Sequence, residues 1–400
     1  MAANTHHRVV IVGGGAAGIS VASRLKRQVD DVAIIDPSEK HYYQPLFTLV
    51  GGGCVKRETT ERDEASVIPK GVAWIKDAVM AFDPDNNSVE TAGGETVSYD
   101  VLIVCPGIQL DWDQTPGLSE TLGKDGVSSN YTYDLAPKTW EFIRNTKSGT
   151  AVFTMPSGPI KCAGAPQKIA YLACDYWRSE GVLDDIDVHL VLPTPRTFGV
   201  SVFADALDEV VADYGIDLHL LSELESVDAG GKKATFKPME GGGDGFTLGY
   251  DMMHVVPHQS APDWVKSSPL STSEPTGYVD IDENTLQHVR YPNIFSLGDA
   301  GSSPNSKTGA AVRKQAPVVA ANVMIQLAGG DPTKKYEGYS SCPLTTSRSK
   351  MLLAEFDYTM EPTPTFPKFI NAQKPRRDMW FVKKYGLPLL YWNLMLKGRG

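Results

Sequence analysis

The sequence predicts an α/β fold with two Rossmann-like domains, followed by a C-terminal amphipathic region. Three observations predict it. At the N-terminus a strand, a glycine-rich turn, a helix and a second strand ending in an acid follow one another. A second strand, helix and strand begin near residue 150, without the glycines. Residues 376–400 then alternate basic, aromatic and leucine side chains, which is not a Rossmann-like pattern and indicates a separate amphipathic region.

Length and composition are those of an ordinary globular protein. The 400 residues, 42% hydrophobic and 22% charged, suffice for two or three folded units. A net charge of -10 argues against a nucleic-acid partner, because a phosphate backbone attracts a basic surface. No apolar run approaches the roughly 18 residues of a spanning helix, and the N-terminus shows no signal peptide. We therefore expect no transmembrane helix and folding in a cytosolic type of compartment.

The first 36 residues carry the pattern of a dinucleotide-binding unit. Residues 8–12 form an apolar strand. The glycine-rich segment GGGAAG follows it, and a helical pattern comes next. Gly13 permits the turn, Gly15 lets the backbone approach a pyrophosphate, and Gly18 packs the helix on the strand. Asp36 ends the next strand 18 residues after Gly18, where a carboxylate accepts from a ribose hydroxyl. This unit is typical of an FAD-binding domain.

Changes in composition predict the domain boundaries. After the apolar strand at 99–107 the chain becomes rich in Asp, Ser and Gly, which places a border near residue 110. A second α/β unit follows, with strands at 150–155 and 187–193 around a helix at 166–178. The strand at 293–299 and the helix at 310–327 return to the first unit. We expect an FAD domain of 1–110 and 280–330, a second domain of 111–279, and a C-terminal region of 331–400.

The last segment, about 376–400, is basic on an otherwise acidic chain. Its cations are Arg376, Arg377, Lys383, Lys384, Lys397 and Arg399, against the single acid Asp378. Its large apolar residues are Trp380, Phe381, Tyr385, Leu387, Leu389, Leu390, Tyr391 and Trp392. Aromatic rings suit the headgroup level and cations suit anionic lipid, so we expect a peripheral membrane-docking segment. Docking on the protein body or in a dimer interface is the alternative.

The five cysteines suggest redox chemistry rather than a disulfide scaffold, because their number is odd and their spacing irregular. Cys162 lies just before a predicted helix and beside Lys161, two features that favour a thiolate. Cys342 precedes a proline and shows no periodicity, which favours an exposed loop. Buried apolar positions are expected for Cys54, Cys105 and Cys174. No paired Cys or His spacing predicts a metal site.

A turn at 296–309 precedes the returning helix and carries two charged residues, Asp299 and Lys307. Asp299 can hold the ribitol of a flavin, and Lys307 can place positive charge beside the flavin ring. Without the surrounding fold, a surface lysine would be the favoured interpretation of Lys307. With it, we expect both residues to face the cofactor.

With these residues in place, the chain resembles the sulfide:quinone oxidoreductases, in the branch that includes the mitochondrial enzyme and bacterial relatives. The resemblance rests on HYYQPLF, IKCAGAPQK, SLGDA, SKTGAAV, YSSCPL, AEFDY and LLYWNLML and covers nearly the whole chain. It implies noncovalent FAD, a redox pair of Cys162 and Cys342, and a quinone pocket that includes Phe356 and Tyr358. The FAD contacts that the motifs and the resemblance indicate are Gly13, Gly14, Gly15, Ala16, Gly18, Asp36, Gln44, Val79, Gly107, Gly298, Asp299, Lys307 and Thr308.

The resemblance also implies a reaction. Hydrosulfide attacks the bridged cysteines, leaves a persulfide on Cys342 and frees Cys162, which passes two electrons to FAD and on to ubiquinone or menaquinone. Sulfite, a small thiol or another sulfide then takes the sulfur. A type II NADH:quinone oxidoreductase is the nearest rival, but the turn around Cys162 lacks the glycines that NADH needs. A membrane-bound redox-sensing flavoprotein without turnover is the other alternative, and a homo-oligomer is compatible with either.

Overall fold

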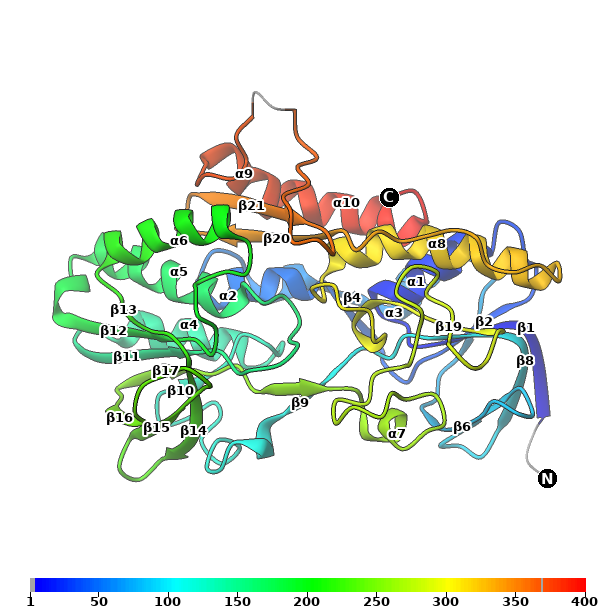
Figure 1. Ribbon diagram of the computed structural model, residues 1–400, viewed down its shortest axis with the longest axis horizontal. Coiled ribbons are helices and arrows are strands. Elements are labelled where there is room, and N and C mark those ends of the chain that lie inside the picture. The colour runs from blue at the N-terminus through cyan, green and yellow to red at the C-terminus, as the bar shows by residue number, and fades with distance from the viewer. Residues whose placement is uncertain (1–3, 368–369) are drawn as a thin grey trace.

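The computed structural model describes residues 4–367 and 370–400, which form two lobes side by side (Figure 1). Each lobe is built on a sheet of mainly parallel strands with helices packed on it, which confirms the predicted α/β class. The C-terminal helices run along the top of both lobes (Figure 1). Among the described residues, no helix is long and apolar enough to cross a membrane.

The first lobe is centred on a sheet with the order β5-β2-β1-β8-β7-β6, in which β19 also pairs with β8. Its strands are β1 (Asn4–Val12), β2 (Val32–Ile35), β5 (Ala73–Ile75), β6 (Val79–Asp83), β7 (Ser88–Thr91), β8 (Thr96–Val104) and β19 (Ile294–Ser296). The last four residues of the central strands, 9–12 of β1 and 101–104 of β8, form continuous apolar runs because both of their faces are covered. Since β19 lies parallel to β8, the chain returns to this sheet after the second lobe. The exact domain borders stay a prediction.

Helices α1 (Ala16–Leu25) and α8 (Gly309–Leu327) pack side by side on this sheet. Each follows the carboxyl end of a parallel strand, so their N-termini lie near the same edge, as in other doubly wound sheets. Gly298 shows how close they come, because a Cβ atom there would lie 3.2 Å from the Cβ atom of Ala17. Shorter elements flank this edge: β3 (Lys40–Tyr42), α2 (Phe47–Gly51), β4 (Glu61–Asp63) and α3 (Glu64–Val67).

The second lobe has a parallel sheet with the order β10-β17-β11-β12-β13. Its strands are β10 (Val127–Ser128), β11 (Gly149–Thr154), β12 (Ile186–Val191), β13 (Asp217–His219) and β17 (Met252–His254), with helices α4 (Ala136–Asn145), α5 (Ala165–Glu180) and α6 (Ser201–Tyr214). An antiparallel sheet of β14 (Ser222–Asp228), β15 (Lys233–Pro238) and β16 (Phe246–Gly249) packs below it (Figure 1). Strands β9 (Gln109–Asp111) and β18 (His258–Ser260) pair where the chain crosses between lobes, and α7 (Asp263–Lys266) follows.

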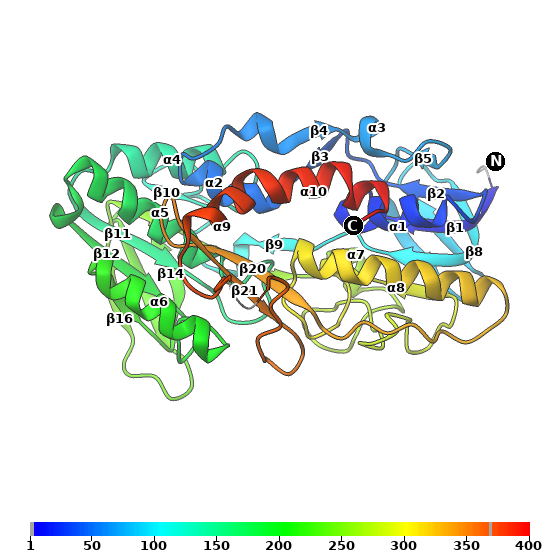
Figure 2. The ribbon, with the colours of Figure 1, turned by 90° about the horizontal axis from the view of Figure 1, so that it is seen from above.

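The C-terminal region begins with the antiparallel pair β20 (Ser340–Thr345) and β21 (Met351–Phe356). It ends in α9 (Arg377–Phe381), a π-helical turn (Val382–Gly386) and α10 (Leu387–Asn393), which form one nearly continuous rod. Seen from above, α10 lies between α8 and the segment of β3, β4 and α3 (Figure 2).

The expected exposed loop at Cys342 is wrong. Cys342 is fully buried in β20, where it pairs with Ala354 of β21. Pro343 lacks an N–H group, but β20 belongs to a two-stranded sheet and both its strands are edge strands, where proline is tolerated. The proline therefore marks an edge strand here and not a loop.

Candidate active site

The glycine-rich turn is packed tightly on one side and open on the other. Gly13 has a φ of +105°, and a Cβ atom there would lie 2.4 Å from the carbonyl oxygen of Cys105. At Gly18 a Cβ atom would lie 1.9 Å from the carbonyl oxygen of Gly13. A Cβ atom at Gly15, by contrast, would meet nothing within 4 Å. The open side of the turn therefore faces the N-terminus of α1, which starts at Ala16 and suits a pyrophosphate.

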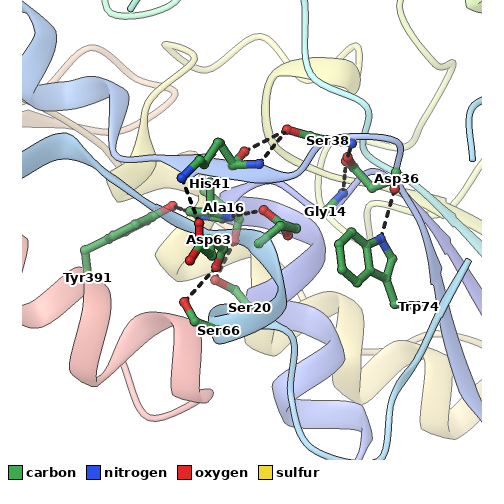
Figure 3. A network of polar contacts seen from close by, with 12 residues as sticks. Gly14, Ala16, Ser20, Asp36, Ser38, His41, Asp63, Ser66, Trp74 and Tyr391 are labelled. Atoms are coloured by element: carbon green, nitrogen blue, oxygen red, sulfur yellow. Dashed lines mark hydrogen bonds and ion pairs between the residues drawn. The ribbon is translucent and has the colours of Figure 1, made fainter. Parts of the chain in front are cut away.

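Asp36 closes this turn from the end of β2. One carboxylate oxygen accepts from the N–H of Gly14 and the other accepts from the N–H of Ser38 at 2.7 Å (Figure 3). The indole of Trp74 donates to the backbone oxygen of Asp36, which fixes the end of the strand (Figure 3). The carboxylate is thus held beside the turn, as a ribose ligand requires.

The turn before α8 lies near the edge of the same sheet. Gly298, with a φ of +72°, donates to the side chain of Gln315, and Thr308 caps α8 by accepting from Ala311. Lys307 donates to the backbone oxygens of Asp299 and Gly301 at 2.8 and 2.9 Å. Burial lowers the pKa of Lys307 to about 8 and raises the pKa of Asp299.

The remaining expected cofactor contacts lie at different places in the first lobe. Gln44 begins a short 3-10 helix, and its side-chain oxygen accepts from Lys161 at 2.7 Å. Gly107 has a φ of +85° and open space where a side chain would stand. Val79 is buried at the start of β6. Their contact with FAD stays a prediction.

The structure brings Cys162 and Cys342 together although they stand 180 positions apart. The N–H of Cys162 donates to the backbone oxygen of Lys307 at 2.8 Å, which ties its loop to the turn before α8. Gly164 lets β20 pack closely on the start of α5. A larger residue would clash, because its Cβ atom would lie 2.2 Å from a methyl group of Leu344. Neither cysteine is bonded to another sulfur in this structure, and the thiol of Cys342 hydrogen bonds with Cys162.

The two sulfurs differ in charge. The hydrogen bond with Cys342, together with the charge and hydrogen bond of Lys168, holds the pKa of Cys162 well below its usual value. The same sulfur contact and burial raise the pKa of Cys342. Lys168 Nζ donates to Cys162 Sγ at 2.8 Å from the first turns of α5. Cys162 is therefore the thiolate of the pair and Cys342 the thiol.

The expectation that Lys161 stabilises this thiolate is wrong. Its Nζ atom instead donates to Gln44 at 2.7 Å. Cys162 has a φ of +56°, a left-handed conformation that few residues other than glycine adopt, so its side chain and that of its neighbour diverge. Lys168, six positions further on, was not singled out from the sequence.

A second cation reaches the pair from the C-terminal rod. Lys383 is 2% exposed, and its Nζ atom donates to the backbone oxygen of Pro45 at 2.8 Å. Burial lowers its pKa to about 7, and its charge acts on Cys162. The segment expected to touch lipid thus also places a buried cation near the redox pair, which its amphipathic pattern alone did not reveal.

Phe356 and Tyr358 do not form a ring pair. Phe356 is buried against Phe198, with ring centroids 5.7 Å apart. Tyr358 packs on Tyr336 instead, and its hydroxyl donates to the backbone oxygen of Glu283. The two rings diverge because β21 ends at Phe356. Their contact with quinone stays a prediction.

Comparisons with known proteins agree with this geometry. Residues 7–316 match the family described as pyridine nucleotide-disulphide oxidoreductase. The mitochondrial sulfide:quinone oxidoreductase of Dictyostelium discoideum is 44% identical over 396 residues, which cover 98% of this chain and 86% of that protein. The mitochondrial sulfide:quinone oxidoreductase of Mus musculus is 42% identical over 398 residues, covering 99% and 88%.

A solved structure supports the fold. The sulfide:quinone oxidoreductase from Aquifex aeolicus superposes with a TM-score of 0.82 at 18% identity, covering 99% of this chain and 92% of that one. The relatives from Dictyostelium and mouse match 98 and 99% of this chain. The predicted resemblance is confirmed: this chain belongs to the sulfide:quinone oxidoreductases, FAD-dependent enzymes within the pyridine nucleotide-disulphide oxidoreductase family.

Proposed function

We propose that this chain oxidises sulfide at the Cys162 and Cys342 pair and passes two electrons through noncovalent FAD to a quinone. The observation that carries the proposal is that Cys162, hydrogen bonded through its backbone to Lys307 and through its sulfur to Lys168, lies beside Cys342. A lysine at 2.8 Å from the thiolate supports it, because such a contact favours the reactive ionised form.

The chain's residues fit FAD. The open side of Gly15, the N-terminus of α1 and the carboxylate of Asp36 would hold the adenosine diphosphate part. Lys307 and Asp299 would lie at the flavin part, since the backbone of Lys307 is hydrogen bonded to Cys162. When bound, FAD supplies a two-electron acceptor next to the cysteines.

The pair performs sulfur exchange. Starting from a Cys162–Cys342 bridge, hydrosulfide forms a bond to the Cys342 sulfur, the bridge breaks, and Cys162 leaves as a thiolate. Lys168 stabilises that leaving group through its charge. When an acceptor such as sulfite, a thiol or sulfide takes the outer sulfur, the two cysteines can bridge again. That bridging would release two electrons, for which bound FAD would be the acceptor beside the pair and ubiquinone or menaquinone the final acceptor.

An anaerobic titration tests this function. Sulfide added to the yellow holoprotein should bleach the flavin absorbance, and a quinone should restore it. NADH should not bleach it, because the turn before α5 lacks the glycines of a nicotinamide-dinucleotide site. Bleaching by NADH without bleaching by sulfide would refute the proposal.

Two variants test the cysteine roles. Cys162→Ser and Cys342→Ser should each abolish sulfide-dependent quinone reduction while FAD remains bound, because neither leaves a pair that can bridge. Cys54→Ser is the matched control, since Cys54 lies against the core outside the pair. Wild-type turnover in either active-site variant would show that the two-cysteine mechanism is wrong.

For location, we propose that the C-terminal rod docks the protein on a lipid surface. Phe381, Tyr385 and Leu389 follow one another every four residues and are 61, 53 and 63% exposed. Trp380, Tyr391 and Trp392, by contrast, are buried and pack against the core of the first lobe. Cations on the exposed side, such as Arg377 and Lys384, would meet anionic headgroups.

Substitutions on the exposed face test this docking without touching the core. Phe381→Ser together with Leu389→Ser should release the holoprotein from vesicles of anionic and neutral phospholipid, with unchanged thermal stability. Met80→Ser is the control, because Met80 is 56% exposed on β6, away from the rod. Undiminished sedimentation of the double variant with the vesicles would contradict lipid docking by this face.

A further inference from the structure

A buried hydrogen-bonded chain connects the C-terminal rod with the glycine-rich turn. It consists of Tyr391 on α10, His41 on β3 and Glu64 at the start of α3, which are 4, 3 and 2% exposed. The ring nitrogen Nδ1 of His41 lies 3.1 Å from Glu64 Oε2, and Nε2 lies 2.5 Å from the Tyr391 hydroxyl. In Figure 3, Tyr391 points from α10 to His41, and Gly14 and Asp36 lie beyond it.

The polar groups of this chain fix its direction. A carboxylate only accepts, so Nδ1 of His41 donates to Glu64 Oε2. In the neutral ring Nε2 then accepts from the Tyr391 hydroxyl. Every atom between α10 and the first Glu64 oxygen is thereby satisfied, which couples the positions of the three side chains.

The second oxygen of Glu64 has no partner. Oε1 is buried and makes no hydrogen bond within the described part of the chain. It lies against the glycine-rich turn, because a Cβ atom at Gly14 would stand 2.8 Å from it and 3.1 Å from the Cβ atom of Asp36. A buried carboxylate oxygen without a donor costs free energy, so this site calls for a donor that the protein does not provide.

The neighbourhood selects the kind of donor. Asp36 faces the position of the cofactor's ribose, and phosphate oxygens offer no hydrogen to a carboxylate. A ribose hydroxyl of the adenosine part offers one. We propose that Glu64 is a further FAD-binding residue, and that the chain of Glu64, His41 and Tyr391 couples occupation of the FAD site to the seating of α10.

The far end of the chain explains why α10 would respond. The ring of Tyr391 packs on Tyr43 with centroids 4.4 Å apart, and Arg62 lies 4.6 Å above the ring of Trp392. Leu389 of the proposed docking face lies two positions before Tyr391 on the same helix. A contact that fixes Tyr391 therefore also fixes the exposed residue Leu389. Because coupling between two sites is reciprocal, the factor by which bound FAD favours the packed position of α10 is also the factor by which packed α10 raises the affinity for FAD.

The first experiment tests the contact with FAD. Glu64→Gln keeps an oxygen for His41 but replaces the free acceptor by an amide that donates. The dissociation constant of FAD, measured by flavin fluorescence on refolded apoprotein, should rise roughly tenfold, because a charge-assisted hydrogen bond is lost. A dissociation constant within twofold of wild type would overturn the assignment of Glu64.

The second experiment tests the coupling. Tyr391→Phe removes only the hydroxyl, and Tyr99→Phe is the matched control because the buried Tyr99 hydroxyl has no hydrogen-bond partner among the described residues. In wild type and control, FAD should slow amide hydrogen exchange of 387–397 about fivefold or more. In Tyr391→Phe this protection should vanish and FAD should bind more weakly. Equal protection in all three proteins would overturn the coupling.

The coupling extends the proposed lipid docking, and its failure can be told apart from a failure of docking. Hydrogen exchange and FAD affinity are measured without vesicles, so they report on the chain of Glu64, His41 and Tyr391 alone. In a vesicle assay the holoprotein should bind more tightly than the apoprotein. If vesicles bind neither form while FAD still protects 387–397, docking is wrong and the coupling stands.

Discussion

The ammonium of Lys168 lies 2.8 Å from the sulfur of Cys162, whereas the adjacent Lys161 points away to Gln44. A lysine within a turn and a half of a helix N-terminus thus sets the charge of the redox pair. The helix N-terminus adds its own positive end near the same sulfur.

Lys168→Met should raise the pKa of Cys162 and slow its reactions at neutral pH. In the reduced protein, the rate of alkylation by iodoacetamide should fall about tenfold for each unit by which the pKa rises above the working pH. The pH dependence of alkylation measures this directly. Lys161→Met is the control and should leave the titration unchanged; if both variants titrate like wild type, Lys168 does not stabilise the thiolate.

Lys383→Met should stabilise the protein at neutral pH. Burial lowers the pKa of Lys383 to about 7, so between about pH 7 and its unfolded pKa the unfolded chain binds more protons than the folded one. In wild type this lysine therefore lowers the free energy of unfolding. This destabilisation becomes smaller as the pH rises from about 7 towards the pKa of the lysine in the unfolded chain. Denaturant unfolding at several pH values should show the advantage of the variant narrowing by about 1.4 kcal/mol per pH unit. A constant difference would contradict burial of a titrating lysine.

Gly15→Ala and Gly18→Ala should fail in different ways. A methyl group at Gly15 meets no protein atom within 4 Å, so the apoprotein should keep its melting temperature while FAD binds more weakly. A methyl group at Gly18 would meet a backbone oxygen at 1.9 Å, so the variant should lose about 1–3 kcal/mol of stability even without FAD. Thermal unfolding of both apoproteins separates the loss of FAD affinity from the loss of stability. Equal melting temperatures of the two variants would contradict the different roles of Gly15 and Gly18.

His254 should make the protein sensitive to acid. It is fully buried in β17, where Nε2 accepts from the N–H of Asn130, and burial lowers its pKa to about 3. Below about pH 6.5 this histidine is protonated in the unfolded chain but stays neutral in the folded chain. The free energy of unfolding therefore falls by about 1.4 kcal/mol for each unit by which the pH is lowered. His254→Gln keeps an acceptor without a proton to gain, and its unfolding free energy should depend less on pH. Parallel pH profiles would show that another group controls acid unfolding.

Local pattern was enough for the dinucleotide-binding unit. The spacing of Gly13, Gly15, Gly18 and Asp36 depends on one strand, one turn and one helix, all close in sequence. The returning helix, predicted from residue 310, begins at Gly309 with Thr308 as its cap. Such elements are encoded by neighbours along the chain, so reading along the chain finds them.

Contacts between distant segments could not be read in this way. Cys342 was expected in a loop because Pro343 interrupts local pattern, but pairing with β21 makes the segment an edge strand. Lys383 was grouped with the lipid-facing cations, yet the packing of the rod on the first lobe turns it inward to Pro45. The buried chain of His41, Glu64 and Tyr391 joins residues up to 350 positions apart and left no local signal.

Composition and short-range spacing encode the dinucleotide-binding unit, the candidate redox cysteines and the amphipathic basic segment, so these features could be predicted from the sequence. Contacts across the fold, by contrast, place Lys168 beside the sulfur of Cys162, bury Cys342 next to it, and leave Phe381, Tyr385 and Leu389 of the rod exposed. Side-chain direction and burial depend on which segments pack together, and that information is distributed over residues far apart in the chain.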